Sequence, residues 1–334
     1  MQTVLVTGGA GYVGSGLVRD LLNDGYKVVC VDNLMFGGES LLNVWHHENF
    51  VFHCCDINDY NAFDVILNAE NYDAVIHLAA IVGDPACKLH SELAHKTNWD
   101  STKHLLDRSI ELGIKRFAFA STCSNYGKMS DPNMYCTENS TLAPVSLYAE
   151  LKVKFENYML TEIEKHKDFC PVSLRFSTVY GISPRMRFDL TVNEFTKEIA
   201  LGRELVIFGE QFWRPYCHVK DFSRAFIAIL NAPKERIEYN VFNVGDTKEN
   251  YTKQMLVDEI KKAIPEAKIK YVEKNEDPRD YRVNCDKIKE ELGFEISLTV
   301  PEGIKEIIEI IQTGLILDPE GQKFYNIPHA RSEV

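Results

Sequence analysis

The sequence predicts an α/β protein with a doubly wound parallel sheet and a smaller C-terminal lobe. Short apolar runs rich in β-branched residues alternate with helix-length amphipathic segments through the first half of the chain. This alternation is typical of a parallel sheet that is covered by helices on both faces. From about Gly181 longer helical segments alternate with short strands and Pro/Gly turns. The length of 334 residues is enough for about two lobes.

The expected elements follow one another in a regular order. Buried strands are predicted at residues 4–6, 28–31, 50–52, 74–76, 117–119 and 172–174. Helices are predicted at 15–24 and 102–112, each closed by a glycine, and in the second half at 192–201 and 252–263. The pattern therefore divides the chain into residues 1–180 and 181–334, with some later segments expected to return to the first part. The last residues, from Asp318 to Val334, are expected to form a surface arm.

The composition excludes several classes of partner. The 37 Lys+Arg against 49 Asp+Glu give a net charge of -12, which disfavours binding to nucleic acid or to an anionic membrane. Nine cysteines without CxxC pairs indicate reduced thiols and a cytoplasmic protein. No apolar run approaches membrane-spanning length. The ten histidines show neither HxH nor HExxH spacing, so no metal is expected.

A glycine-rich loop follows the first expected strand. Gly8, Gly11 and Gly14 are spaced as GxxGxxG, with Tyr12 and Val13 between the last two. Glycine permits the tight strand-to-helix turn and lets the backbone approach a pyrophosphate at the positive end of the helix. Because the loop lies between a strand and a helix, it predicts a Rossmann-type dinucleotide site in residues 1–180.

The ends of the next strands complete this predicted site. Asp32 ends the second strand, where its carboxylate can bind both ribose hydroxyls and would repel a 2′-phosphate, so NAD is favoured over NADP. Asp56 can bond the adenine amine while Ile57 packs on its ring. His77 is expected to be a buried, hydrogen-bonded histidine. Further cofactor contacts are expected from Asn33, Leu78, Ala79, Ala80 and Thr97.

Two later segments carry the chemistry. Ala120–Gly127 and Tyr148–Lys152, together with the glycine loop, resemble the extended short-chain dehydrogenase/reductases, specifically the nucleotide-sugar epimerase/dehydratase family, over nearly the whole chain. The phenol of tyrosine has a pKa of about 10 and needs help to act as a base. Lys152 lies one helical turn after Tyr148, and its charge is expected to favour the phenolate.

The resemblance implies a reaction and its participants. Tyr148 would take the proton of a sugar hydroxyl, at C4, while NAD takes the hydride from the same carbon and a 4-keto sugar results. Thr122 would bond the same hydroxyl and relay its proton. Tyr148 and Lys152 would also contact NAD. The substrate would be a nucleotide-diphosphate sugar, bound mainly by residues 181–334.

The fate of the ketone distinguishes members of this family. The 4,6-dehydratases continue their threonine with Asp-Glu, whereas this chain has Cys123 and Ser124, which cannot replace that acid pair. Return of the hydride to the opposite face, which is 4-epimerisation, is therefore expected. The alternative is a C4 dehydrogenase, for example of a GDP-heptose, that releases the keto product. The segment Gly181–Leu190 resembles such enzymes and epimerases of specialised sugars. A 4,6-dehydratase or a non-catalytic NAD-binding protein fits less well.

The resemblance also implies residues for the substrate. Arg214 matches the family's phosphate-binding arginine, and either Arg279 or Arg282 matches the second one, because guanidinium groups form bidentate bonds to phosphate. Thr178 stands where many epimerases carry a substrate-binding Asn. The remaining expected contacts are Val82, Thr122, Cys123, Ser124, Asn193 and, beside the nucleobase, Val206 and Phe208.

A homodimer is expected as well. Family members commonly pair the helices near 98–112 and 148–165. The apolar Leu105, Leu106, Phe155 and Met159 would suit such an interface or the protein's own core.

Overall fold

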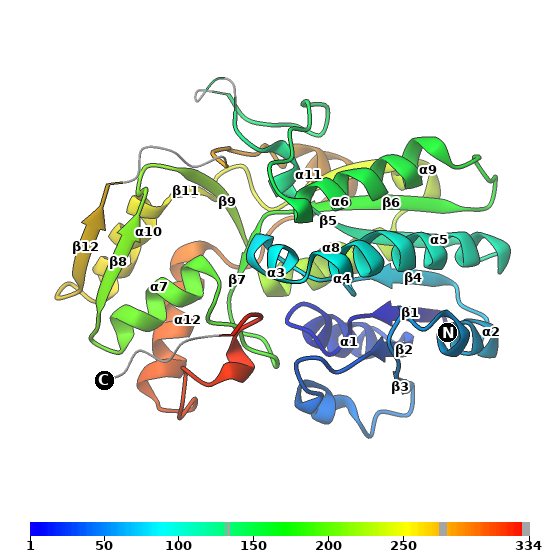
Figure 1. Ribbon diagram of the computed structural model, residues 1–334, viewed down its shortest axis with the longest axis horizontal. Coiled ribbons are helices and arrows are strands. Elements are labelled where there is room, and N and C mark those ends of the chain that lie inside the picture. Colours follow the sequence, from blue (N-terminus) through cyan, green and yellow to red (C-terminus); the bar gives the residue numbers. More distant parts are fainter. Residues whose placement is uncertain (130, 132–133, 274–278, 329–334) are drawn as a thin grey trace.

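The computed structural model describes residues 1–129, 131, 134–273 and 279–328, and a seven-stranded parallel sheet is its centre (Figure 1). The strand order is β10-β6-β5-β4-β1-β2-β3. The strands are β1 (Thr3–Thr7), β2 (Lys27–Asp32), β3 (Phe50–Cys54), β4 (Ala74–His77), β5 (Arg116–Thr122), β6 (Cys170–Phe176) and β10 (Asn240–Val244). The doubly wound parallel sheet predicted from the alternating pattern is confirmed.

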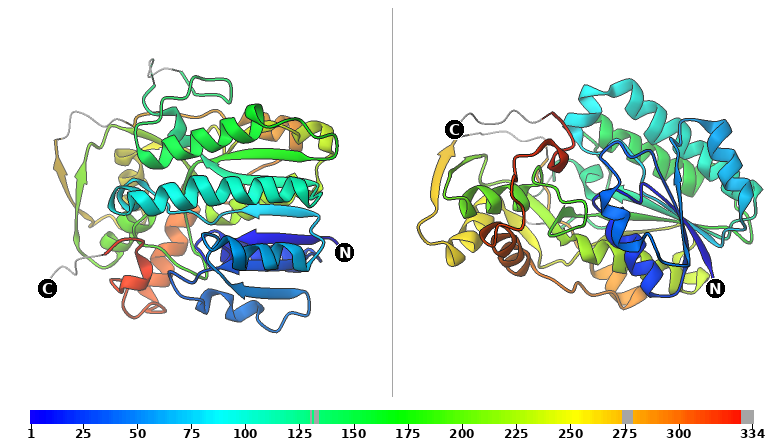
Figure 2. Two further views of the ribbon diagram at one scale, coloured as in Figure 1. Left: turned by 45° about the vertical axis from the view of Figure 1, so that its right-hand side comes forward. Right: turned by 90° about the horizontal axis from the view of Figure 1, so that it is seen from below.

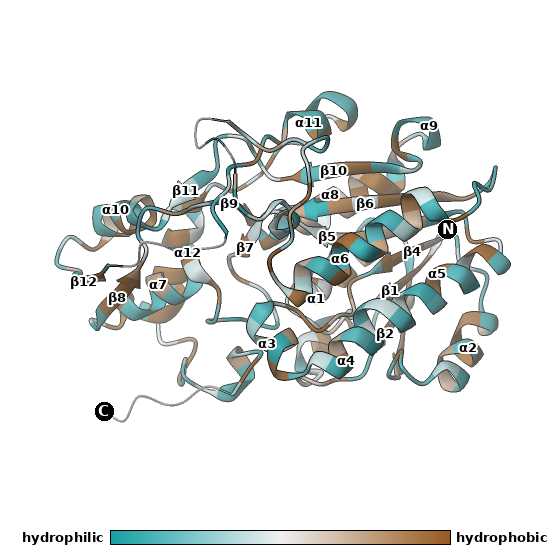
Figure 3. Ribbon diagram, turned by 45° about the horizontal axis from the view of Figure 1, so that its top comes forward, coloured by the Kyte–Doolittle hydropathy of each residue, from teal (hydrophilic) through white to brown (hydrophobic). Residues whose placement is uncertain are grey.

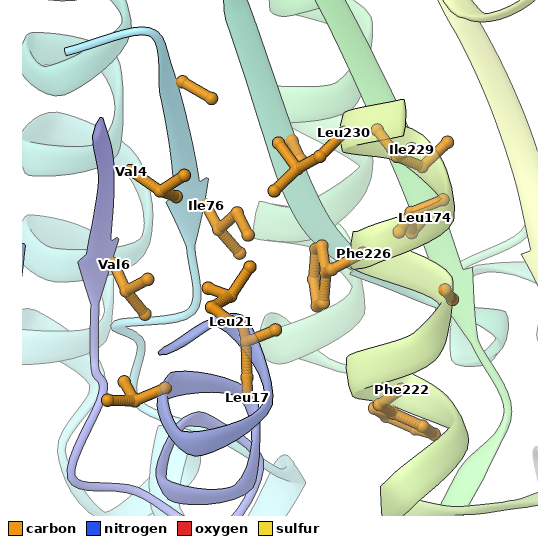
Figure 4. Packing of buried hydrophobic residues seen from close by; sticks show 14 of the residues in the cluster. Val4, Val6, Leu17, Leu21, Ile76, Leu174, Phe222, Phe226, Ile229 and Leu230 are labelled. Carbon is orange, nitrogen blue, oxygen red and sulfur yellow. The ribbon is translucent and has the colours of Figure 1, made fainter. Parts of the chain in front are cut away.

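One face of this sheet is covered by α1 (Gly14–Asn23) and α8 (Val219–Asn231). Figure 4 shows side chains of both helices packed against those of the central strands. The labelled residues are Leu17 and Leu21 of α1, Phe222, Phe226, Ile229 and Leu230 of α8, and Val4, Val6, Ile76 and Leu174 of the sheet. Successive strand residues point to opposite faces, so a strand covered on both sides must be apolar throughout. This explains the uninterrupted runs in the sequence.

The opposite face is covered by α2 (Tyr60–Ala69), α5 (Thr102–Glu111) and α6 (Leu147–Asn157). Figure 3 shows that α5 and α6 carry both hydrophobic and hydrophilic faces. Leu105, Leu106, Phe155 and Met159 are fully buried here, in the protein's own core. These four side chains therefore belong to the protein's own core, which was one of the two roles expected for them, and not to a dimer interface.

The second lobe is built around two smaller sheets (Figure 2). One has the order β11-β9-β7 and the other pairs β12 with β8. The bounds are β7 (Thr178–Tyr180), β8 (Glu204–Phe208), β9 (Trp213–His218), β11 (Asn250–Thr252) and β12 (Lys268–Val272). Helices α7 (Thr191–Ala200), α10 (Lys253–Ala263) and α12 (Val300–Gln312) share its apolar core.

Shorter helices complete the fold. They include α3 (Asp84–Leu89) and α4 (Ser91–His95), which contact α6, and α9 (Lys234–Ile237) and α11 (Asp286–Leu292), which contact β10. The predicted strands and helices all occur. Of the seven strands in the main sheet, β10 is the one that was not predicted. Its run is interrupted by the polar Asn243, which is buried and accepts a hydrogen bond from the Tyr126 hydroxyl (2.6 Å). Over the described ranges, no helix combines the length and the apolar character needed to cross a membrane.

Candidate active site

A cavity of about 580 Å³ lies at the carboxyl ends of β1, β2, β4 and β5, where they face the second lobe. This is the edge at which doubly wound sheets bind ligands. Most of the residues singled out in the sequence line it: Gly8, Gly11, Tyr12, Val13, Gly14, Asp32, Asn33, Asp56, Ile57, Leu78, Ala79, Ala80, Val82, Thr97, Thr122, Ser124, Tyr148, Lys152, Thr178, Arg214 and Arg279. A single cavity thus collects side chains from both lobes.

The glycine loop has no room for a side chain at Gly8 or Gly14. Gly8 has a φ of +76°, and a Cβ there would lie 2.7 Å from the backbone nitrogen of Ala79. At Gly14 a Cβ would lie 2.2 Å from the carbonyl oxygen of Gly8. The backbone is therefore free to approach a ligand closely at the start of α1, as binding of a pyrophosphate at a helix N-terminus requires.

Asp32 is the last residue of β2 and lies beside the glycine loop. Its carboxylate accepts hydrogen bonds from the backbone N–H groups of Ala10 (3.0 Å) and Leu34 (2.8 Å). Burial raises the pKa of Asp32, and these two bonds oppose that shift. The carboxylate is fixed at the end of β2 and lines the cavity, where it fits the ribose of NAD.

His77 is the last residue of β4, and its ring lies between two threonine hydroxyl groups. Its Nδ1 lies 2.7 Å from the hydroxyl of Thr7, and its Nε2 lies 2.9 Å from that of Thr102. Burial, followed by the charge of Lys152, lowers the pKa of His77 to about 3, so the ring is neutral at neutral pH. This is the buried, hydrogen-bonded histidine that the sequence suggested.

Tyr148 and Lys152 lie one turn apart near the start of α6. The helix begins after Ser146, whose hydroxyl accepts the backbone N–H of Ala149 (3.4 Å). The Lys152 ammonium donates to the carbonyl of Ala120 (2.7 Å) and lies 5.8 Å from the centre of the Tyr148 ring. Burial lowers the pKa of Lys152 to about 8 and raises that of Tyr148. Burial is the largest influence on the pKa of Tyr148, and the expectation that Lys152 favours the phenolate stays a prediction.

Thr122 and Ser124 enter the cavity from the end of β5. The Thr122 hydroxyl accepts the backbone N–H of Ser124 (3.1 Å), and the Ser124 hydroxyl lies 3.3 Å from that of Tyr281. Cys123, between them, points away: it is buried, does not line the cavity and donates to the carbonyl of Arg175 (3.2 Å). A buried thiol and a hydroxyl, those of Cys123 and Ser124, thus stand where the 4,6-dehydratases carry their carboxylic pair.

The structure separates the three candidate phosphate-binding arginines. Arg214 lines the cavity and donates to the carbonyl of Trp213 (2.6 Å). Arg279 also lines it and forms an ion pair with Asp84, with Nη1 2.8 Å from Oδ2. Arg282 lies outside the lining and places its guanidinium over the Trp213 ring, 5.1 Å from the ring centre. Arg279 is therefore the better placed of the last two.

Three further predicted residues lie away from the cavity wall. The Asn193 side chain is buried, accepts the backbone N–H of Gly181 (2.9 Å) and donates to the carbonyl of Arg187 (2.8 Å). Val206 and Phe208 project from β8 and are 40% and 51% exposed. Their contacts with a substrate stay predictions.

Sequence reasoning missed two arginines that line the cavity. Arg187 forms a bidentate ion pair with Asp189, at 2.8 and 2.9 Å. Arg185 is buried, its guanidinium lies 4.4 Å from the centre of the Phe36 ring, and its Nε and Nη2 have no hydrogen-bond partner in the described part of the chain. The unusual run Gly181–Leu190 was the available signal, but only as a resemblance. Unpartnered buried cation atoms beside the glycine loop fit an anionic cofactor such as NAD.

Comparison with known proteins agrees with this geometry. Residues 4–245 match the profile of the NAD dependent epimerase/dehydratase family. A UDP-glucuronate 4-epimerase of Thermodesulfobacterium geofontis is 30% identical over 92% of this chain and 95% of its own. The solved structure of a UDP-glucose 4-epimerase from Thermotoga maritima, with UDP-glucose, is 29% identical and superposes with a TM-score of 0.83 over 94% of this chain and all of that one. A dTDP-glucose 4,6-dehydratase from Bacillus anthracis shares the fold, with a TM-score of 0.81 and 22% identity over 97% of this chain and 99% of its own.

Proposed function

The chain belongs to the NAD dependent epimerase/dehydratase family, and on that basis we propose that it is an NAD-dependent 4-epimerase of a nucleotide-diphosphate sugar. One observation carries the proposal. Tyr148, Lys152 and Thr122 line the same cavity as the glycine loop and Asp32, so the sugar-oxidising groups face the cofactor site. A non-catalytic NAD-binding protein would have no need for this arrangement.

Tyr148 acts as the base in this proposal. It removes the proton of the sugar C4 hydroxyl, and Thr122 holds that hydroxyl and shares its proton. NAD, when bound, accepts the hydride from C4 and later returns it. Lys152 holds its ammonium at the carbonyl of Ala120, and a positive charge near the phenol would favour the phenolate form of Tyr148.

The ketone is expected to be reduced again rather than dehydrated. Elimination of water across C5 and C6 needs a carboxylic acid and base beside Thr122, where the chain has the inward-turned Cys123 and the hydroxyl of Ser124. Rotation of the keto sugar followed by hydride return to its other face gives the C4 epimer. The names of the relatives support this outcome, since they are 4-epimerases of UDP-sugars.

The diphosphate is expected beside Arg214 and Arg279. Both guanidinium groups line the cavity, and Asp84 balances the charge of Arg279. A diphosphate would replace this carboxylate as the partner of Arg279, and bidentate bonding would favour the exchange. Thr178 also lines the cavity, and we expect it to contact the sugar.

The experiment that tests the function is turnover of a nucleotide-sugar panel. Purified protein is incubated with UDP-, GDP-, CDP- and dTDP-sugars, with and without added NAD, and products are identified by NMR while NADH absorbance is recorded. An epimerase gives a C4 epimer without net NADH. Accumulation of NADH with a 4-keto product would instead support the C4 dehydrogenase, and absence of turnover across the panel would contradict both.

Two further expectations remain part of the proposal. The protein is expected to be a homodimer in the cytoplasm, on the basis of the family resemblance and of its reduced cysteines. Light scattering coupled to size-exclusion chromatography measures the first directly. A monomeric mass over the micromolar range would contradict it.

A further inference from the structure

The C-terminal arm, of which residues 318–328 are described, reaches the catalytic cavity. The sequence predicted only a surface segment here, but Asn326 and Ile327 line the cavity that Tyr148 also lines. In Figures 1 and 2 the red segment that follows α12 runs towards α3. The arm therefore touches both lobes.

The start of the arm is fixed to the second lobe. The backbone N–H of Phe188 donates to the carbonyl of Phe324 (3.0 Å), and their rings pack edge to face at 5.4 Å. The buried Lys197 donates to the hydroxyl of Tyr325 (2.8 Å) and to Glu320 (2.9 Å). Buried, charge-assisted bonds of this kind hold the backbone in place, so the residues that follow have a defined position.

Ile327 connects the arm to the first lobe. It packs against an apolar cluster to which Tyr148 and Leu147 are also packed. The cluster consists of Ile81, Ala86, Cys87, Ala94 and Leu151. An aliphatic side chain at this place excludes water from the surroundings of Tyr148, and exclusion of water strengthens electrostatic interactions at a reacting group.

Asn326 has an unused hydrogen-bonding atom at the cavity. Its backbone N–H donates to Asp189 (3.0 Å), which in turn holds Arg187. Its side-chain oxygen is buried and has no hydrogen-bond partner within the described ranges. A buried acceptor without a donor is costly, so a donor supplied by the ligand would be favoured. Sugars are rich in hydroxyl donors.

We propose that the arm is part of the sugar site: Asn326 accepts a hydrogen bond from a hydroxyl of the substrate sugar, and Ile327 shields Tyr148 from water. This rests on the proposed function, since it requires a sugar beside Tyr148. The nucleotide and its diphosphate lie with Arg214 and Arg279 in that function. The arm therefore distinguishes a nucleotide sugar from the free nucleotide.

The test compares affinity for a nucleotide sugar with affinity for its nucleotide. Calorimetry on NAD-loaded protein in a Tyr148→Phe background, which prevents turnover, uses UDP-glucose against UDP and GDP-mannose against GDP. Asn326→Leu keeps the volume but removes the acceptor, and it is expected to weaken binding of the sugar nucleotide about fivefold to tenfold. Binding of UDP or GDP is expected to be unchanged.

Ile327→Ala provides the second measurement, in the otherwise unaltered enzyme. It is expected to lower kcat at least threefold with little change in the melting temperature. Leu317→Ala is its matched control, because this leucine precedes the arm and is 95% exposed.

The outcomes separate the inference from the function on which it rests. Equal affinities for the sugar nucleotide in Asn326→Leu and the parent would overturn the role of Asn326. An unchanged kcat in Ile327→Ala would overturn the shielding by the arm. If the parent binds neither the sugar nucleotides nor UDP and GDP, the proposed function falls and the inference falls with it.

Discussion

The two halves of the cavity are built in different ways. The cofactor half consists of short segments that directly follow β1, β2, β3 and β4, so each side chain is positioned by the strand before it. The substrate half combines β7, β9, the segment at Arg279–Tyr281 and the C-terminal arm, which are far apart in the sequence. A local motif is enough to build the first half, whereas the second depends on tertiary packing.

The difference also appears in how charge is arranged. In the cofactor half the carboxylate of Asp32 is held by two backbone N–H groups and lines the cavity. In the substrate half Arg279 and Arg187 are already paired with Asp84 and Asp189. A substrate must therefore exchange partners there, whereas the cofactor meets groups that are already aligned. Variants in the two halves should have separable effects.

The largest effect is expected where the halves meet, at Tyr148. Tyr148→Phe keeps the ring but removes the hydroxyl, so turnover should fall roughly 10²- to 10⁴-fold, the usual contribution of a general base. NAD retained after purification should not change. Tyr158→Phe is the control, since that hydroxyl bonds Asp107 away from the cavity. Turnover within tenfold of the parent would remove Tyr148 from the mechanism.

The next effect is confined to the cofactor half. In Gly14→Ala the new Cβ would lie 2.2 Å from the Gly8 oxygen and 2.6 Å from the Cα of Gly9, so the helix must shift. We expect loss of bound NAD and a decrease of about 1–3 kcal/mol in the free energy of unfolding. Both are measured, by acid release of NAD and by urea titration.

Gly16→Ala is the matched control on the same helix. Its nearest foreign atom would be the Ser223 hydroxyl at 3.7 Å, an ordinary contact. Retention of NAD by Gly14→Ala at the level of Gly16→Ala would show that the tight loop is not needed for the cofactor.

A smaller effect should be confined to the substrate half. Arg279→Gln removes a cation from the cavity and leaves Asp84 to repel a diphosphate, so UDP should bind at least about tenfold more weakly, which is about 1.4 kcal/mol. NAD binding should stay the same. Arg282→Gln, outside the lining, should change UDP affinity much less. The reverse ranking in calorimetry would assign the phosphate to Arg282.

The last effect concerns the stability of the fold rather than catalysis or ligand binding. Burial lowers the pKa of His77 to about 3 from an ordinary value of 6.5, so the unfolded chain takes up a proton that the folded protein refuses. Stability should therefore be lost as the pH falls from 6.5 towards 3, by up to about 1.4 kcal/mol per pH unit.

The variant His77→Asn lacks this titration. Urea unfolding at several pH values between 6.5 and 4.5 should give a shallower dependence than in the parent. Identical slopes would mean that His77 is protonated in the folded protein as readily as in the unfolded one.

The cofactor half of the cavity could be predicted from the sequence much more fully than the substrate half. The glycine loop, Asp32 and the Tyr148–Lys152 pair are recognisable because local spacing alone fixes their geometry. Asn326 and Ile327 carry no local signal, because tertiary contacts such as the bond from Asn326 to Asp189 bring them to the cavity. The raised pKa of Tyr148 was also beyond the sequence, since it depends on how deeply the phenol is buried.

The C-terminal arm has a practical consequence for anyone who handles the protein. Ile327 lies at the cavity that Tyr148 also lines. A purification tag or a fluorescent fusion joined soon after Ile327 would therefore be attached beside the cavity. The amino end of β1 lies at the opposite edge of the sheet, because the cavity is formed at the carboxyl ends of the strands. A tag joined before β1 stays away from Tyr148, and an inactive preparation tagged after Ile327 should first be retested without its tag.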